Sequence, residues 1–332
     1  MQKIKILIIR NDIPNIKAEY TNKHLQKIKK ISHNVDLNLI YPKKEIVGKY
    51  LSEASILICP RYNFSDLLDF RVASKLRWVH ITSAGTDDIA LALKKTGVLL
   101  TNSSGVHPIP ITEHVFAFLL IFSRQIYRSY RIQIEEKSWK RDHNILRPTE
   151  LHDRTISIVG FGRIGNRIAK IAKSFGMNVV VLSHKTTVNK TYVDKAYPSS
   201  DIDLLLNSSD FVVNCLPLTK ETKFFFTFKK FQQMKNTAYF INVGRGKTVV
   251  ESGLIHALEK KIIAGAGLDV FNEEPLPNSS KLWNLKNVIL TPHYAGWTPN
   301  YMDRVIDIFC INLQAYLQKK RMPNLVDKNT GY

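Results

Sequence analysis

Short runs of apolar, mostly β-branched residues recur along the 332-residue chain, and each run ends at a glycine, a proline or a polar residue. Such runs predict strands buried on both faces, as in parallel sheets. Segments between them place apolar residues three or four positions apart, which predicts amphipathic helices. Strands are predicted over residues 5–9, 35–40, 55–59, 78–81, 155–159, 178–182, 210–214, 238–242, 265–270 and 287–291, and helices over 21–31, 44–51, 66–76, 110–131 and 301–319.

The alternation of strands and helices predicts an α/β fold with doubly wound parallel sheets. Residues 1–102 contain enough elements for a small unit of their own, and residues 103–297 contain a second and longer series. The last predicted helix comes after the final strand of that series. We therefore expect it to return to the first unit, so that one domain, 103–297, is inserted in another, 1–102 and 298–332.

One predicted strand, Thr155–Val159, runs directly into a glycine-rich turn of sequence GFGRIG, residues 160–165. A helical pattern follows, and then the strand Asn178–Leu182. Strand, glycine turn, helix and strand within about 30 residues form the context in which a dinucleotide-binding turn is found. A purely structural glycine turn is the alternative.

Each glycine of this turn has a physical role in a dinucleotide site. Gly160 permits a tight turn, Gly162 lets the backbone approach a pyrophosphate, and Gly165 lets the helix pack closely on the strand. The first N–H groups of the helix, around Arg163 and Ile164, then face the phosphates. We expect these five residues to bind the cofactor.

The end of the strand Asn178–Leu182 indicates which dinucleotide binds. An NAD site usually has Asp or Glu there for the ribose 2′-hydroxyl. This chain has Ser183, His184 and Lys185 instead, a hydroxyl donor and a positive charge with no acid to repel a 2′-phosphate. We therefore expect NADP in preference to NAD. The alternative is that Lys185 belongs to a solvated loop and that selectivity is loose.

Composition limits the classes of protein and partner. The formal net charge is +20, which could attract nucleic acid, but the lysines are dispersed and no nucleic-acid-binding motif accompanies them. The longest apolar run, residues 115–122, is too short to cross a bilayer. We expect no nucleic acid, membrane or metal partner. Three distant cysteines without a CxxC spacing favour a reducing cytoplasm.

Three further motifs follow predicted strands of the longer domain. They are residues 242–246 (NVGRG), 267–277 (GLDVFNEEPLP) and 291–296 (TPHYAG). Ligands of open α/β sheets bind at the carboxyl ends of the strands. An arginine, a glutamate and a histidine are therefore expected to converge beside the nicotinamide.

These motifs, together with residues 84–87 (AGTD), 216–222 (LPLTKET) and 282–283 (LW), resemble those of the D-isomer-specific 2-hydroxyacid dehydrogenases over almost the whole chain. The resemblance implies two Rossmann-like domains. The dinucleotide-binding domain would be residues 103–297, inserted in a smaller, flavodoxin-like substrate domain of residues 1–102 and 298–332.

The resemblance maps the catalytic arginine, glutamate and histidine of the family onto Arg245, Glu274 and His293. Glu274 is preferred to Glu273 because it stands directly before proline. Singly, the three residues would fit a turn, a surface position and a buried histidine. Together they suit reduction of a 2-oxo acid, in which negative charge develops on the carbonyl oxygen. Arg245 would hold and polarise the substrate, His293 would donate the proton, and Glu274 would favour the protonated imidazole.

The resemblance implies further contacts with cofactor and substrate. Asp269 matches an aspartate that contacts the nicotinamide carboxamide. Ala84 and Gly85 match backbone N–H groups that bind the substrate carboxylate, and Arg61 lies where some relatives place an arginine facing the substrate. The remaining residues expected at the cofactor are Pro217, Thr222, Val243 and Gly296.

We therefore expect an NAD(P)H-dependent enzyme that reduces a small 2-oxo acid to the D-2-hydroxy acid. It most resembles the NADP-preferring glyoxylate/hydroxypyruvate reductase branch, and the family implies a homodimer formed through residues 115–150. One alternative is D-3-phosphoglycerate dehydrogenase, with Arg61 as the extra cation for the phosphate. An alternative of another class is a nucleotide-sensing binding protein of the corepressor type. The sequence leaves open which 2-hydroxy acid is the substrate.

Overall fold

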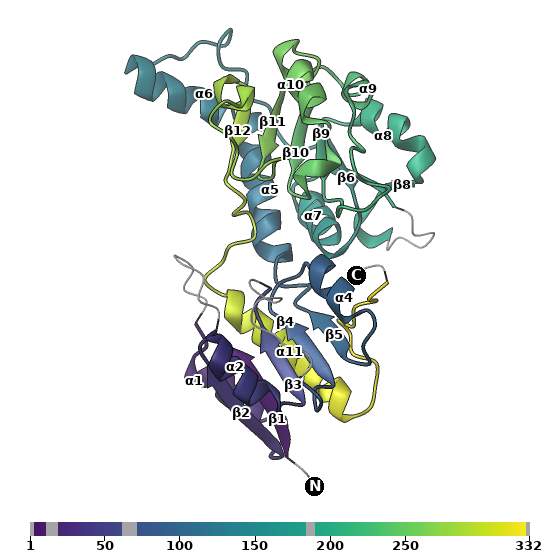
Figure 1. Cartoon of the computed structure of the whole chain (residues 1–332). Coiled ribbons are helices and arrows are strands. Elements are labelled where there is room, and N and C mark those ends of the chain that lie inside the picture. The colour runs from purple at the N-terminus through teal and green to yellow at the C-terminus, as the bar shows by residue number, and fades with distance from the viewer. Residues whose placement is uncertain (1–2, 11–18, 62–71, 184–189, 330–332) are drawn as a thin grey trace. The chain divides into compact units, whose positions relative to one another are not determined.

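The computed structural model describes the chain apart from residues 1–2, 11–18, 62–71, 184–189 and 330–332, and it contains two compact units (Figure 1). Unit 1 comprises Met1–Val106 and Thr298–Tyr332, and unit 2 comprises His107–Trp297. The division expected from the sequence, at residues 102 and 298, lies close to these boundaries. The predicted helix over residues 66–76 falls mostly outside the described residues.

Unit 1 is built on a five-stranded parallel sheet in the order β2-β1-β3-β4-β5. This is the flavodoxin-like order of parallel strands, in which the strand order reverses between β1 and β3. The strands are β1 (Ile4–Ile9), β2 (Val35–Ile40), β3 (Ile56–Cys59), β4 (Trp78–Ile81) and β5 (Leu99–Asn102), and the helices are α1 (Asn22–Lys29), α2 (Lys44–Leu51), α4 (Asp87–Leu93) and α11 (Tyr301–Leu317).

Alternate residues of these strands bury opposite faces of the sheet, as the two-residue period of a strand requires. Ile6 and Ile8 of β1 pack in the core that contains α11 and α1, while Leu7 and Ile9 pack in the core that contains α2 and α4. The C-terminal helix α11 therefore belongs to unit 1, where it covers one face of the sheet (Figure 1).

We expect His80 of β4 to make the stability of unit 1 depend on pH. Its side chain is fully buried, and its two ring nitrogens lie 2.7 Å from Thr101 Oγ1 and 3.1 Å from Ser103 Oγ. Burial lowers the pKa of His80 to about 3, whereas a histidine in an unfolded chain titrates near ~6.5. Between these values only the unfolded state binds the proton, so the free energy of unfolding falls as the pH falls.

We expect His80 to lower the free energy of unfolding by about 2 kcal/mol between about pH 7 and pH 5. Urea unfolding of the wild type and of His80→Asn over this range would measure the effect. The variant should lack this part of the pH dependence. The same pH dependence in both proteins would show that His80 does not cause it.

Unit 2 contains a seven-stranded parallel sheet in the order β12-β11-β10-β9-β6-β7-β8. The order reverses between β6 and β9, which is the switch point of a dinucleotide-binding Rossmann fold. The predicted fold class is confirmed. The strands are β6 (Thr155–Val159), β7 (Asn178–Leu182), β8 (Lys195–Tyr197), β9 (Phe211–Asn214), β10 (Tyr239–Asn242), β11 (Gly265–Leu268) and β12 (Val288–Leu290).

Helices cover both faces of this sheet, as in Figure 1. One hydrophobic core joins a sheet face to α5 and α7, and the other joins the opposite face to α8, α9 and α10. The helices are α5 (Pro108–Ser123), α6 (Ile126–Arg131), α7 (Arg163–Ser174), α8 (Ile202–Ser208), α9 (Phe228–Gln232) and α10 (Glu251–Glu259), with a π-helical turn at Ile132–Glu136 and 3₁₀ turns at Lys190–Tyr192, Ser199–Asp201, Gly246–Thr248 and Lys281–Asn284.

The single helix predicted over residues 110–131 is wrong, because the chain bends after Ser123. Gln125 adopts a left-handed conformation with φ of 56°, and its Nε2 donates to the Phe122 carbonyl (2.8 Å). The helices before and after the break meet at 71°. Within the described part of the chain no single helix is long and apolar enough to cross a membrane, and α5 is largely buried in the core of unit 2.

Candidate active site

The glycine turn lies at the carboxyl end of β6, beside the switch point of the unit 2 sheet. Gly160 has φ of +100°, and a Cβ there would lie 2.9 Å from the carbonyl carbon of Cys215. A Cβ on Gly165 would lie 2.7 Å from the carbonyl oxygen of Gly160. Both positions therefore require glycine, the first for its conformation and the second for close packing of α7 on β6.

The residues of this turn fit the pyrophosphate of a dinucleotide. Gly162 is the N-cap of α7, and a Cβ built on it meets no atom within 4 Å, so the space in front of the helix is open. Arg163 and Ile164 are the first two helical residues. The backbone N–H groups at a helix start, next to glycines that leave the backbone accessible, can form an anion-binding site.

The strand end that distinguishes the two dinucleotides is only partly described. Ser183 follows β7 as a half-buried residue, and its N–H donates to the carbonyl of Tyr197 (3.1 Å). His184 and Lys185 lie outside the described residues. Their expected contact with a 2′-phosphate stays a prediction.

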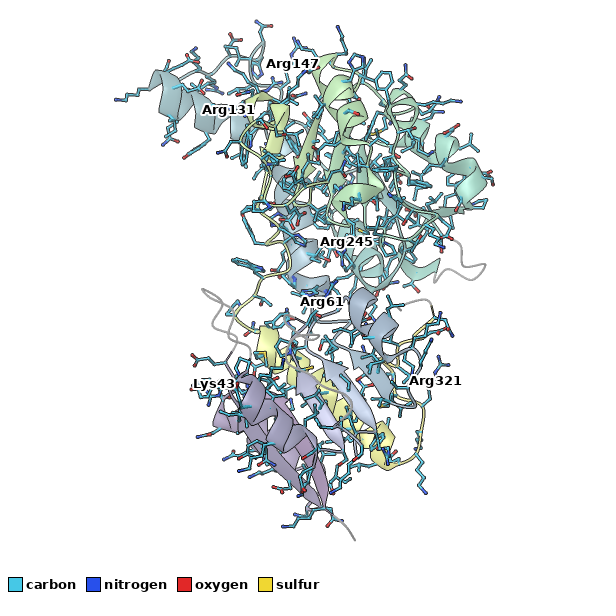
Figure 2. The ribbon with its side chains drawn as sticks, in the orientation of Figure 1. Lys43, Arg61, Arg131, Arg147, Arg245 and Arg321 are labelled. Carbon is cyan, nitrogen blue, oxygen red and sulfur yellow. The ribbon has the colours of Figure 1, made fainter. Side chains whose placement is uncertain are left out.

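Arg245 lies in the turn after β10, and a buried hydrogen-bond network fixes this turn. Asn242 Oδ1 accepts from Gly244 N (3.2 Å) and from Asn214 Nδ2 (3.0 Å). Asn214 Nδ2 also donates to Thr248 Oγ1 (2.7 Å), whose hydroxyl donates to the Arg245 carbonyl (2.6 Å). The Arg245 side chain is exposed (Figure 2). A rigid turn thus presents the guanidinium at the carboxyl edge of the sheet, where Arg245 Nη1 donates to the Gly244 carbonyl (2.9 Å).

The turn after β10 packs against the loop after β11. A Cβ on Gly246 would lie 1.8 Å from the carbonyl oxygen of Phe271, so the two backbones touch. Phe271 N donates to Glu274 Oε1 (2.9 Å). The contact therefore places the segments that carry Arg245 and Glu274 side by side.

His293 and Glu274 form a direct hydrogen-bonded pair. His293 Nδ1 lies 2.6 Å from Glu274 Oε2, and the side chains are 52% and 34% exposed. Since Phe271 N occupies the other carboxylate oxygen, the orientation of Glu274 is fixed. His293 is not the buried histidine that the sequence left open as an alternative. Its second ring nitrogen is left as the atom that can exchange a proton with a substrate.

Asp269 is buried and holds the loop that carries His293. Its carboxylate accepts hydrogen bonds from Thr291 Oγ1 (2.7 Å), Tyr294 N (3.0 Å) and Ala295 N (3.1 Å). The side chain is 3% exposed. These bonds give Asp269 a structural role, and its expected contact with the nicotinamide stays a prediction.

The other residues expected at the cofactor also follow strands of unit 2. Thr222 Oγ1 donates to the carbonyl of Pro217 (2.6 Å), which closes the turn after β9. Val243 is buried directly after β10. The Gly296 carbonyl lies 3.2 Å from His107 Nδ1. Among the described residues no group of three or more His, Cys, Asp or Glu side chains could hold a metal ion.

The expected substrate residues belong to unit 1. Half-buried Arg61 follows β3, and Ala84 and Gly85 follow the neighbouring strand β4. Asn102 Nδ2 donates to the Ala84 carbonyl (2.8 Å) and Ser83 Oγ to the Gly85 carbonyl (3.0 Å), which orders the loop. All three expected residues thus lie at the carboxyl edge of the unit 1 sheet.

Sequence reasoning missed His114 and the hydroxyl of Thr291. His114 of α5 lies 3.0 Å, through Nε2, from Thr291 Oγ1, although 177 positions separate them. The only signal in the sequence is one polar ring inside an apolar helix, which does not identify its partner.

A family model, a relative in sequence and a solved structure each match more than half of this chain. The family model for "D-isomer specific 2-hydroxyacid dehydrogenase, NAD binding domain" matches residues 116–295. A glyoxylate reductase of Pyrococcus furiosus is 36% identical over 293 residues, which cover 86% of each chain. Among solved structures, a D-isomer specific 2-hydroxyacid dehydrogenase family protein from Aeromonas salmonicida has a TM-score of 0.82 and 30% identity, over 98% of this chain and 100% of that one.

A further solved structure has the same fold at lower identity. It is an NADPH-dependent glyoxylate/hydroxypyruvate reductase from Sinorhizobium meliloti in complex with NADP and sulfate, with a TM-score of 0.80 and 24% identity, over 99% of this chain and 100% of that one.

Proposed function

The chain belongs to the D-isomer specific 2-hydroxyacid dehydrogenases, and we propose that it reduces glyoxylate, hydroxypyruvate or a similar small 2-oxo acid with NADPH. It is an NAD(P)-dependent oxidoreductase that converts a 2-oxo acid to the D-2-hydroxy acid. The observation that carries the proposal is the His293–Glu274 pair, 2.6 Å apart, on the sheet that also carries Arg245 and the glycine turn. Its relatives named glyoxylate reductase support this choice of substrate.

The bound nicotinamide supplies the hydride that reduces the carbonyl carbon. The residues of the chain stabilise the charge that this transfer creates. Arg245 binds the carbonyl and carboxylate oxygens of the substrate through its forked N–H donors and polarises the carbonyl. His293 donates the proton to the developing alkoxide from Nε2, because Nδ1 is bonded to Glu274. In the oxidation direction the same ring accepts the proton.

Glu274 orients the imidazole. Its Oε2 lies 2.6 Å from Nδ1, so that Nε2 is the ring nitrogen left for the substrate. The bond from Phe271 N to Oε1 keeps the carboxylate in place while the charge of the ring changes. His293 thus alternates between proton donor and acceptor without losing its orientation.

A panel of 2-oxo acids tests this function. Glyoxylate, hydroxypyruvate, pyruvate and 3-phosphohydroxypyruvate would each be mixed with NADPH or NADH, and nicotinamide absorbance would be followed. We expect the highest kcat/KM with glyoxylate or hydroxypyruvate. A preference for 3-phosphohydroxypyruvate would favour D-3-phosphoglycerate dehydrogenase. Cofactor binding without turnover of any 2-oxo acid would favour the nucleotide-sensing binding protein.

We propose that Arg61 and the loop at Ala84 and Gly85 bind the anionic groups of the substrate. Arg61 follows a buried strand at the carboxyl edge of its sheet, where ligands of such sheets bind. Residues that bind the anionic groups of a substrate, and not its reacting carbonyl, act mainly on substrate affinity. The effect of Arg61→Leu should accordingly appear in KM more than in kcat.

The expected preference for NADPH rests on residues 183–185, where the chain has no carboxylate. Lys185→Asp should weaken NADPH binding and have little effect on NADH, because the new charge repels only the 2′-phosphate. Dissociation constants for both cofactors, from quenching of protein fluorescence, would measure this. The exposed Lys195→Asp, at the start of β8, is a control for the change of net charge. Equal weakening of both cofactors would contradict the assignment.

We propose a homodimer formed through the segment 115–150. Within unit 2, α6 and the chain after it form an arm, residues 126–147, that extends away from the sheet (Figure 1). Arg131 and Arg147, which lie on this arm, are labelled in Figure 2. Large apolar side chains on the arm are exposed: Tyr130 by 60%, Ile134 by 58% and Trp139 by 95%. Exposed apolar groups in one segment indicate an interaction surface.

The proposed location is the cytoplasm, where the three free cysteines stay reduced.

The double variant Ile134→Glu, Trp139→Glu is expected to be monomeric, because two charges would be buried at the interface. Sedimentation velocity would compare it with the wild type and with Leu204→Glu, a change at an exposed leucine of α8. The wild type and the control should both be dimers. A monomeric wild type would rule out this proposal.

A further inference from the structure

His114, Thr291 and Asp269 form a hydrogen-bonded chain of side chains next to the loop that carries His293. The proton-transfer step does not use this chain. His114 Nε2 lies 3.0 Å from Thr291 Oγ1, which lies 2.7 Å from Asp269 Oδ1. The side chains of His114 and Asp269 are 13% and 3% exposed. The chain runs from helix α5 to the ends of β11 and β12, and so it ties the helix to the loop that carries His293.

The direction of each hydrogen bond in this chain follows from the donors available. The Asp269 carboxylate can only accept, and Oδ1 already accepts from Tyr294 N (3.0 Å). Thr291 must therefore give its one hydroxyl proton to Asp269. It then accepts from His114, which requires a proton on Nε2 of the imidazole.

The charge state of His114 is compatible with this direction. Burial lowers the pKa of His114, and the nearby charge of Asp269 opposes that effect only in part. The ring is therefore neutral at pH 7, with a single proton that must occupy Nε2 to complete the chain. Two aromatic rings meet the imidazole at near right angles, Phe118 at 4.7 Å and Tyr294 at 5.3 Å between centroids, and they limit rotation of the ring.

The loop held by this chain has an unfavourable backbone conformation at His293 itself. His293 has φ of +52°, a left-handed conformation that residues with a Cβ rarely adopt and that costs backbone strain. Its N–H donates to the carbonyls of Asp269 (3.0 Å) and Thr291 (2.9 Å). Asp269 and Thr291 thus hold His293 through their backbone carbonyls as well as through the hydrogen bond between their side chains.

We propose that His114 is a positioning residue for His293. As the neutral Nε2–H tautomer it directs the Thr291 hydroxyl to Asp269, and the completed chain holds the 291–295 loop so that the His293 ring faces Glu274. The inference rests on the proposed function, in which His293 is the proton donor. It assigns a role to two residues, His114 and Thr291, that do not touch the reacting atoms.

Steady-state kinetics of two variants test this role. His114→Leu and Thr291→Val each break the chain without adding a charge, and each should lower kcat by about 10- to 100-fold, the effect of a small displacement of a catalytic group. KM for glyoxylate and the dissociation constant for NADPH should change little, and the number of NADPH sites per chain should equal that of the wild type, whereas an unfolded fraction would lower this number. Thr291→Ser, which restores the hydroxyl, should recover most of the rate.

Two matched controls remove the same kinds of group elsewhere in unit 2. The controls are Thr155→Val and His256→Leu. Thr155 is at the start of β6, at the opposite end of the sheet from Thr291, and His256 is on α10. Both should keep the wild-type kcat. Wild-type kcat in His114→Leu would overturn the inference, as would a Thr291→Ser variant no faster than Thr291→Val.

A second measurement needs no turnover. Long-range ¹H–¹⁵N correlation spectra of the wild type at pH 7 distinguish the two neutral tautomers of each histidine, and the signals missing from His114→Gln identify His114. We expect the Nε2–H tautomer. The Nδ1–H tautomer would overturn the inference even in an active enzyme, whereas an inactive enzyme with the Nε2–H tautomer would locate the error in the proposed function.

Discussion

Replacement of His293 by alanine is expected to lower kcat by about 10²–10⁴-fold, the usual contribution of a positioned general acid. The proton for the developing alkoxide would then have to come from water. NADPH binding should be almost unchanged, because the proposed phosphate site is the glycine turn and the start of α7, a different segment from the loop that carries His293. Stopped-flow reduction of glyoxylate at saturating NADPH, with a separate binding titration, would measure both effects.

The two neighbouring glutamates provide a matched control for this prediction. Glu274 bonds His293 directly, whereas Glu273 is an exposed residue of the same loop. Glu274→Gln should lower kcat, because the amide can no longer offer two equivalent acceptor oxygens to Phe271 N and to the His293 ring. Glu273→Gln should behave as the wild type. Normal turnover by His293→Ala would show that another group donates the proton.

Replacement of Arg245 by alanine is expected to lower kcat/KM for glyoxylate by at least about 10²–10³-fold, the effect of losing one group that stabilises an oxyanion. The guanidinium is proposed to bind the substrate and to stabilise charge in the transition state, so both kcat and KM should deteriorate. Arg245→Lys should recover little, since an ammonium cannot form the two parallel hydrogen bonds of a guanidinium. Steady-state kinetics over a range of glyoxylate concentrations would measure the change.

Lys247 is the control for Arg245, because it is exposed two positions further along the same turn. Lys247→Ala removes an equal charge from that turn without removing the proposed substrate contact. If Lys247→Ala lost as much activity as Arg245→Ala, the effect would be one of general electrostatic attraction.

Local sequence was sufficient for features that a few adjacent residues determine. The turn at Gly160 is an example, because its conformation and its packing depend on glycines within one strand–helix unit. The break after Ser123 was missed, since an apolar pattern continues past it and the left-handed Gln125 has no strong signal in composition. The spatial order of the strands was not predicted, because the strand pattern alone does not specify which strands are neighbours.

Long-range contacts in the site could be predicted only where a motif carried them. Glu274 and His293 lie 19 positions apart, and the proline after Glu274 distinguished it from Glu273. Nothing comparable marked the chain from His114 to Asp269, because a histidine in an apolar helix is compatible with many partners. The structural role of Asp269 was likewise hidden, since its donors include backbone N–H groups that have no signature in the sequence.

The most direct test of the account is the product formed from hydroxypyruvate. The enzyme would be mixed with hydroxypyruvate and a limiting amount of NADPH, and the products would be separated by chiral chromatography. The expected result is one D-glycerate for each NADPH oxidised. L-glycerate, a racemic mixture, or NADPH oxidation without glycerate would contradict it.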